Sequence, residues 1–227
     1  MKRKYCSFTL VAFFCFSISL FGQELEPASG WYVRFDAGLS SARDPELTIP
    51  EGPLPADLST SPLFGGGIGL TYVPGIRTDL TATYRSGFEQ ISGFDGMPSG
   101  LAEFQSLVTL LSLYLDLYQM PRITPYGGFG LGFSRNNLGR ITITNPDGTL
   151  LGTIEGKTNT SYAYQLCAGA SIQVSNRLLL DVGYHFLKAG DYESEDLLIF
   201  PDDTSVPGKD FGKFRSHEII LSLQYIF

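Results

Sequence analysis

The sequence predicts an all-β chain that folds as an eight-stranded antiparallel up-and-down transmembrane β-barrel, and three observations support this prediction. Segments in which apolar and polar residues alternate recur along the chain, whereas helical periodicity is absent after residue 22. Short and long connections between these segments alternate. The last segment, residues 217–227, has one apolar and one polar face and runs up to a C-terminal aromatic residue. In a membrane barrel the apolar face of each strand contacts lipid and the polar face lines the interior.

Four alternating segments are expected in the first half, at residues 30–42, 62–72, 78–90 and 103–118. Each contains apolar residues on one side, and the polar side of the second is mostly glycine, which suits curvature and close packing. The predicted lipid-facing residues of these segments include Trp31, Val33, Phe35, Leu39, Phe64, Ile68, Leu70, Tyr72, Leu80, Tyr84, Phe88, Leu107, Leu111, Leu113, Leu115 and Leu117. Four strands therefore precede the middle of the chain.

The second half repeats the pattern at residues 124–144, 160–175, 178–189 and 217–227. Its predicted lipid-facing residues include Phe129, Leu131, Phe133, Tyr162, Tyr164, Leu166, Leu180, Val182, Tyr184, Phe186, Ile219, Leu221, Leu223, Tyr225 and Phe227. Aromatic residues near the strand ends, among them Trp31, Tyr72, Tyr84, Tyr162, Tyr225 and Phe227, are expected to set the depth of the barrel in the bilayer.

The connections divide into two classes. Tight turns are expected near Gly75, Met120 and Asn176, and Arg77 is assigned to the first of them, Val73-Pro74-Gly75-Ile76-Arg77. Longer loops are expected at about residues 43–61, 91–102, 136–159 and 190–212. Short periplasmic turns and long extracellular loops are typical of outer-membrane barrels, whereas a soluble sandwich or lipocalin-like domain has no reason to place every long loop at one end.

The N-terminus predicts export. Lys2, Arg3 and Lys4 precede an uncharged apolar run to Phe21, which is the order of a secretory signal peptide. We expect residues 1–22 to be this signal peptide and residues 23–227 to be the barrel domain. Cys167 is then the one cysteine of the mature chain, and its small neighbours suggest a place in a packed wall.

The composition excludes several classes of function. The full chain of 227 residues has a formal net charge of −7, so nucleic acid is not an expected partner. No helical apolar run of spanning length follows residue 22, which excludes a helical membrane protein. No metal-ligand spacing or phosphate-binding glycine loop is found, and we expect no metal and no cofactor.

Three segments resemble the small eight-stranded outer-membrane β-barrels of the opacity-protein and OmpA-transmembrane type: residues 125–132 (PYGGFGLG), residues 180–186 (LDVGYHF) and the terminal Tyr225-Ile226-Phe227. The resemblance covers nearly the whole mature chain. It implies a surface antigen of the Gram-negative outer membrane that contacts membrane lipid and lipopolysaccharide. It also implies that Tyr225 and Phe227 form the signal read by the barrel assembly machinery during biogenesis.

Charged residues on the polar side of the strands are the nearest feature to a chemical site. They are Arg34, Asp36, Asp79, Arg85, Asp116, Asp181, His185 and Glu218. Buried charges must pair or hydrogen-bond, so these residues are expected to form an ion-pair network that plugs the lumen. The alternative is a narrow gated channel for ions or small solutes; a wide pore is excluded because side chains nearly fill an eight-stranded barrel.

An enzyme is not expected. Ser216, His217 and Glu218 are adjacent and resemble the residue types of lipid-modifying barrel enzymes, but neighbours in a strand point to opposite faces and cannot act together. The loops therefore carry the expected function, which is adhesion or another surface interaction. In the acidic fourth loop Tyr192, Ile199 and Phe200 are possible contacts with a host or cell-surface ligand.

Overall fold

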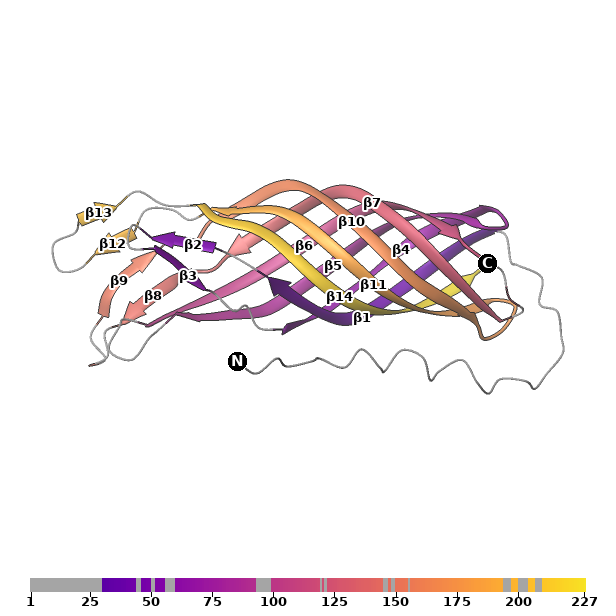
Figure 1. Ribbon diagram of the computed structural model, residues 1–227, viewed down its shortest axis with the longest axis horizontal. Helices are drawn as coiled ribbons and strands as arrows, with labels where there is room; N and C mark the ends of the chain where they lie inside the picture. Colours follow the sequence, from indigo (N-terminus) through magenta and orange to yellow (C-terminus); the bar gives the residue numbers. More distant parts are fainter. Residues whose placement is uncertain are drawn as a thin grey trace, which may run out of the picture.

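The computed structural model describes residues 30–43, 46–49, 52–55, 60–92, 99–118, 120, 122–144, 147, 150–154, 156–193, 197–199, 204–206 and 210–227. Eight long strands form a barrel wall (Figure 1). They are β1 (Gly30–Arg43), β4 (Thr60–Val73), β5 (Ile76–Ser92), β6 (Ser99–Asp116), β7 (Ile123–Leu138), β10 (Thr158–Gln173), β11 (Leu178–Glu193) and β14 (Asp210–Ile226). The predicted signal peptide lies outside the described residues.

The wall is closed and antiparallel throughout. Each strand pairs with its neighbour along the chain, and β14 pairs with β1, so none of the eight strands is left with an open edge. Following the register once around the wall, Trp31 leads back to Ser41, ten residues further along β1. This stagger tilts the strands, as Figure 1 shows, and confirms the predicted fold class.

The two ends of the barrel differ. At one end, the turn end, short connections join β4 to β5, β6 to β7 and β10 to β11, and Gly30 and Phe227 lie there too. At the other, the loop end, short strands are added: β2 (Glu46–Ile49), β3 (Gly52–Pro55), β8 (Ile141–Thr144), β9 (Leu150–Ile154), β12 (Leu197–Ile199) and β13 (Thr204–Val206) (Figure 1). The short-turn and long-loop asymmetry thus follows the prediction.

The loop end is more ordered than expected. The sequence predicts an exposed loop at residues 43–61, yet β2 and β3 pair as a hairpin there. Strand β8 pairs with the loop end of β6, and β9, β12 and β13 continue the same sheet beyond the wall. Backbone pairing between different loops, which no local pattern reveals, accounts for this difference.

The outer surface of the wall is apolar. Exposed side chains of β1, β6, β7 and β14 include Phe35, Leu111, Leu131 and Ile219, which is unusual for a surface in water but suits contact with lipid. Aromatic side chains concentrate towards both ends, and Trp31, Tyr72, Tyr84, Tyr162, Tyr225 and Phe227 are all exposed. Within the described residues, no helix is long and apolar enough to span a bilayer.

The interior contains a cluster of apolar side chains as well as polar ones, which corrects the expectation of a polar lining throughout. A cluster of buried apolar side chains, here called the apolar plug, lies mostly in the loop-side halves of the strands. It consists of Ala42, Phe104, Val108, Leu110, Leu138, Ala163, Leu187, Ala189 and Phe214. Like the polar residues of the lumen, these apolar residues occupy inward-facing positions of their strands. The alternation of side chains determines which residues face inward, but not whether they are polar or apolar. Charged and tyrosine side chains fill the turn-side half, whereas the buried Arg85–Glu218 pair and the polar Ser106, Ser134, Asn136 and Ser216 lie at the level of the plug.

Candidate functional site

Arg34 on β1 is the centre of the polar interior. Its Nη1 atom lies 2.6 Å from Oδ2 of Asp79, and its Nε atom donates to Oδ1 of Asp36 at 2.9 Å. Nη2 also donates to Oγ of Ser222 on β14 at 2.8 Å. Strands β1, β5 and β14 therefore meet across the lumen through one guanidinium group.

Arg77 is the centre of a second group of charged residues nearer the turn end. The prediction that it belongs to the preceding turn is wrong. The turn is confined to Pro74 and Gly75, so Arg77 belongs to β5 and its side chain is buried in the lumen. Its Nη2 atom lies 3.3 Å from Oδ1 of Asp116, and Nη1 lies 4.0 Å from Oδ2 of Asp181. The sequence did contain the information that places Arg77 in the lumen, because Arg77 precedes Asp79 by two residues and therefore faces the same side of the strand.

Tyrosine side chains separate and support these two arginines. The guanidinium carbon of Arg77 lies 5.5 Å from the ring centre of Tyr114 and 5.1 Å from that of Tyr126, and the two rings meet edge to face. The Tyr126 hydroxyl donates to Oδ1 of Asp181 at 2.6 Å. Tyr126 is not among the predicted lumenal residues, although its side chain lies on the same face of β7 as Gly128 and Gly130.

The third ion pair, Arg85 with Glu218, is fully buried and separate from the others. Arg85 donates from Nε to Oε1 at 2.6 Å and from Nη2 to Oε2 at 2.8 Å. Hydroxyl groups of Ser40 and Ser216 each donate to Oε1 at 2.9 Å. The carboxylate thus receives four hydrogen bonds, which offset the cost of burying its charge.

Seven of the eight charged residues expected in the lumen are placed in three groups, and Arg77 is an additional member of the second. Arg34 joins Asp36 and Asp79; Arg77 joins Asp116 and Asp181; Arg85 joins Glu218. His185 is buried on β11, whose register places it opposite Glu218, but its Nδ1 atom has no hydrogen-bond partner among the described residues. Arg85 and Asp116 do not pair with each other, because each has a different partner of opposite charge.

The residues considered for catalysis point to opposite sides of β14. Ser216 and Glu218 are buried in the lumen, whereas His217 lies on the outer face against Tyr184 and Phe186. Among the described residues, no group of three or more His, Cys, Asp or Glu side chains could hold a metal ion. The backbone at Tyr192 and Ile199 belongs to β11 and β12, but these two side chains, and Phe200 entirely, lie outside the described residues.

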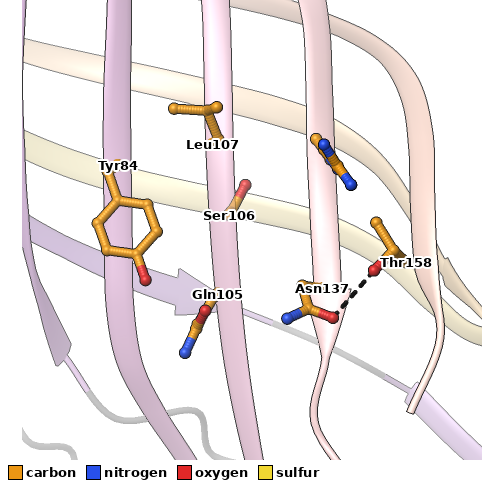
Figure 2. A pocket seen from close by; sticks show the side chains of 7 residues that line it. Tyr84, Gln105, Ser106, Leu107, Asn137 and Thr158 are labelled. Atoms are coloured by element: carbon orange, nitrogen blue, oxygen red, sulfur yellow. Dashed lines mark hydrogen bonds between the residues drawn. The ribbon is translucent and has the colours of Figure 1, made fainter.

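A recess of about 200 Å³ lies on the outer wall near the loop end. Residues of β5, β6, β7 and β10 line it, and Figure 2 shows them together with the hydrogen bond that Thr158 Oγ1 donates to Asn137 Oδ1 at 3.0 Å. The lining residues are Tyr84, Gln105, Ser106, Leu107, Arg135, Asn137 and Thr158. It combines an exposed arginine with amide, hydroxyl and aromatic groups on an otherwise apolar wall.

Comparisons with known proteins agree with this architecture. No protein-family model matches the chain. An uncharacterised protein of Brucella suis is 26% identical over 195 residues, which cover 72% of this chain and 68% of that protein. A candidate adhesin of Rickettsia typhi is 24% identical over 210 residues, with 86% and 87% covered. The outer membrane protein PagN of Salmonella typhimurium is 22% identical over 173 residues, with 67% and 71% covered.

Among solved structures, the outer membrane protein OprG from Pseudomonas aeruginosa shares the fold. It superimposes with a TM-score of 0.55 at 15% identity, over 88% of this chain and 96% of that one. The closed wall, its apolar outer surface and these similarities confirm the predicted location in the bacterial outer membrane.

Proposed function

We propose that this chain, one of the small eight-stranded β-barrels of the bacterial outer membrane, serves as a rigid scaffold whose loop end mediates adhesion or another surface interaction. The observation that carries the proposal is the filled lumen. Three buried arginines bind carboxylates across it, and the apolar plug packs the loop-side half. A barrel whose lumen is filled in this way is suited to holding its loops in place and not to conducting solutes.

The arrangement of the loop end supports the same proposal. The sheet continues from β6 through β8, β9, β12 and β13, so two loops extend one side of the wall as a shared platform. Paired backbone holds such a platform in place and leaves less conformational entropy to lose when a ligand binds. We propose that Tyr192, Ile199 and Phe200 in the fourth loop contact a host or cell-surface ligand.

The similarity to candidate adhesins of Rickettsia supports adhesion in particular.

For biogenesis, we propose that Tyr225 and Phe227 present the terminal signal to the barrel assembly machinery. Their rings contact each other edge to face at 5.6 Å on the outer surface, where both are exposed.

A narrow channel is the competing function, and one observation favours it in the turn-side half. Buried atoms Nε of Arg77, Oδ1 of Asp79 and Nδ1 of His185 have no hydrogen-bond partner within the described residues, and water is the natural partner for such groups. Entry of water from the turn end would still meet the apolar plug. The plug and the fully buried Arg85–Glu218 pair at its level fill this part of the lumen and oppose the passage of ions.

The proposal is tested with bacteria that display the protein on their surface. One variant replaces residues 197–206, which include β12 and β13, by a Gly-Ser linker of equal length; the control variant is Arg177→Gln at the turn end. We expect the wild type and the control to bind cultured epithelial cells above a vector background, and the loop variant to lose most of this binding. Heat-dependent gel mobility establishes that each barrel is folded. Binding at background level by the folded wild type would overturn the proposal.

A further inference from the structure

Three cationic side chains stand on the outer wall close to the loop end. They are Arg135 on β7, Lys188 on β11 and Arg215 on β14, here called the basic band. Each has the outward parity, because the residues on either side of it in the chain are buried: for example Leu187 and Ala189 flank Lys188. The band is a local feature, since the whole chain has a formal net charge of −7.

Two members of the band face each other directly. Lys188 and Arg215 are register partners in the β11–β14 pair. Like charges directly opposite each other destabilise a sheet. The described outward neighbours of Lys188 and Arg215 are Tyr164, Phe186, His217 and Ser41, none of which is acidic. An anion from outside the chain would relieve this repulsion.

The band lies at the height of a lipid headgroup. Directly towards the turn end from it, the outer wall carries the exposed aromatic residues Tyr84, Phe133 and Tyr164, and beyond these mostly apolar side chains such as Leu131 and Leu166. Aromatic girdles mark the boundary between the hydrocarbon layer and the headgroups. Lys188 already lies over the ring of Tyr164, with Nζ 5.7 Å from its centre, and so is held at this boundary.

The recess of Figure 2 adds a shaped element beside the band. Arg135 lines it together with Asn137 and Thr158, which supply amide and hydroxyl groups, while Tyr84 and Leu107 form its apolar side. Arg135 forms no ion pair with another described residue. A guanidinium group next to neutral hydrogen-bonding groups suits a phosphate on a sugar, and the apolar side suits an acyl chain.

We propose that the basic band and this recess bind the phosphorylated glucosamine headgroup of lipopolysaccharide in the outer leaflet. Arg135 contacts one phosphate from the recess, and Lys188 with Arg215 contacts a phosphate on the neighbouring strands. The site lies on the lipid-facing wall and is independent of the loop platform in the proposed function. Loss of adhesion would therefore leave this proposal standing, and the reverse is also true.

The test measures lipid binding by native mass spectrometry of the protein folded in a maltoside detergent, which carries no phosphate. The variants are the triple substitution R135Q/K188Q/R215Q, the charge-keeping Lys188→Arg, and the control Arg177→Gln, which removes an exposed cation at the turn end. The probes are bisphosphorylated lipid A, the same lipid after removal of its phosphates, phosphatidylglycerol and inorganic phosphate. Heat-dependent gel mobility confirms that all variants are folded.

We expect the triple variant to bind bisphosphorylated lipid A at least roughly tenfold more weakly than the wild type, because several charge-assisted hydrogen bonds are lost. Lys188→Arg and Arg177→Gln should bind like the wild type. Dephosphorylated lipid A should bind the wild type as weakly as the phosphorylated lipid binds the triple variant. Equal binding by the triple variant would overturn the proposal. Phosphatidylglycerol or inorganic phosphate binding as tightly as lipid A would overturn the assignment to lipopolysaccharide.

Discussion

Glu218 shows how a barrel of this size can bury a full charge. Its carboxylate is completely buried, and it is opposed by a bidentate Arg85 and two serine hydroxyls from β1 and β14. A buried pair contributes little net stability when its desolvation is counted, but removing one partner leaves an uncompensated charge. The pair therefore matters most for keeping β5 and β14 in a single arrangement.

We expect Arg85→Leu to lower the free energy of unfolding by about 3–5 kcal/mol, since Glu218 would be left without a cation. The double variant R85L/E218L should be clearly more stable than the sum of the two single substitutions implies. Urea titrations of the protein folded in lipid vesicles measure both quantities. Additive effects of the two substitutions would contradict a direct pair.

Lumenal tyrosines require glycine on the strand beside them. A Cβ atom on Gly169 would lie 2.6 Å from the Tyr126 hydroxyl oxygen and 2.5 Å from the Val182 carbonyl oxygen, closer than atoms can approach. The ring of Tyr32 covers Gly69 in the same way. Gly127, on β7, has the Cys167 carbonyl oxygen at 4.0 Å as the nearest neighbour of an added Cβ.

Gly169→Ala should therefore lower the free energy of unfolding by about 1–3 kcal/mol through overpacking. Gly127→Ala is the matched control and should change it by less than about 0.5 kcal/mol. Thermal or urea unfolding of the two variants side by side measures the difference. Similar stability of both variants would show that the tyrosine rings move aside without cost.

Along each strand, the alternation of faces separates the side chains that contact lipid from those that lie in the lumen. In β6, Leu107, Leu111 and Leu115 are exposed on the outer face, whereas Ser106, Ser112 and Tyr114 are buried in the lumen. The outer residues are stabilised by lipid and not by protein contacts. The effect of a substitution on this face should depend on its depth in the bilayer.

Leu111 lies near the middle of β6 and Leu117 just beyond its turn end, and both are exposed. We expect Leu111→Arg to destabilise the folded barrel in vesicles by about 2–4 kcal/mol and Leu117→Arg by only about 0–1 kcal/mol. Equal effects at the two positions would mean that the outer face does not contact a hydrocarbon layer.

The whole molecule joins a wall with two different ends to an interior of two different parts. The turn-side half holds the Arg34 and Arg77 ion pairs and the tyrosines, and the loop-side half holds the apolar plug together with the Arg85–Glu218 pair. Because these two parts lie in series along the lumen, opening the turn-side ion pairs leaves the loop-side half closed, and breaking Arg85–Glu218 leaves the apolar plug in place. The ion pairs should therefore act as braces and not as a gate.

We expect Arg85→Gln and Asp116→Asn each to lower stability without producing conductance in planar bilayers. The wild type should likewise show no steady ion conductance, since the apolar plug opposes ions in all three proteins. Current recordings together with thermal unfolding on the same preparations make this test. Stable openings in either variant would identify the lumen as a gated channel.

The sequence by itself determined the wall of this protein. Alternation determined which of the described side chains face outward, apart from the irregular pairing after Ser86 and after Lys188, and the tight turns determined the order of strands and the end at which the loops gather. These features depend on near neighbours in the chain, so a local pattern contains them. Three strand assignments are wrong. Arg77 is assigned to a turn because Pro74-Gly75 marks a turn but not how soon the next strand begins. The predicted strand 124–144 is divided into β7, which ends at Leu138, and β8, which pairs with the loop end of β6. The last strand begins at Asp210 and not at residue 217.

Only the tertiary structure decided which inward and outward residues meet. The ten-residue stagger around the barrel brings Arg34 to Asp79 and Ser222, places Arg85 against Glu218, and sets Lys188 opposite Arg215. It also gathers inward apolar residues from distant strands into one plug. The physical reason is that register across strands results from closing the whole sheet, whereas the period of two within each strand is set by the backbone alone.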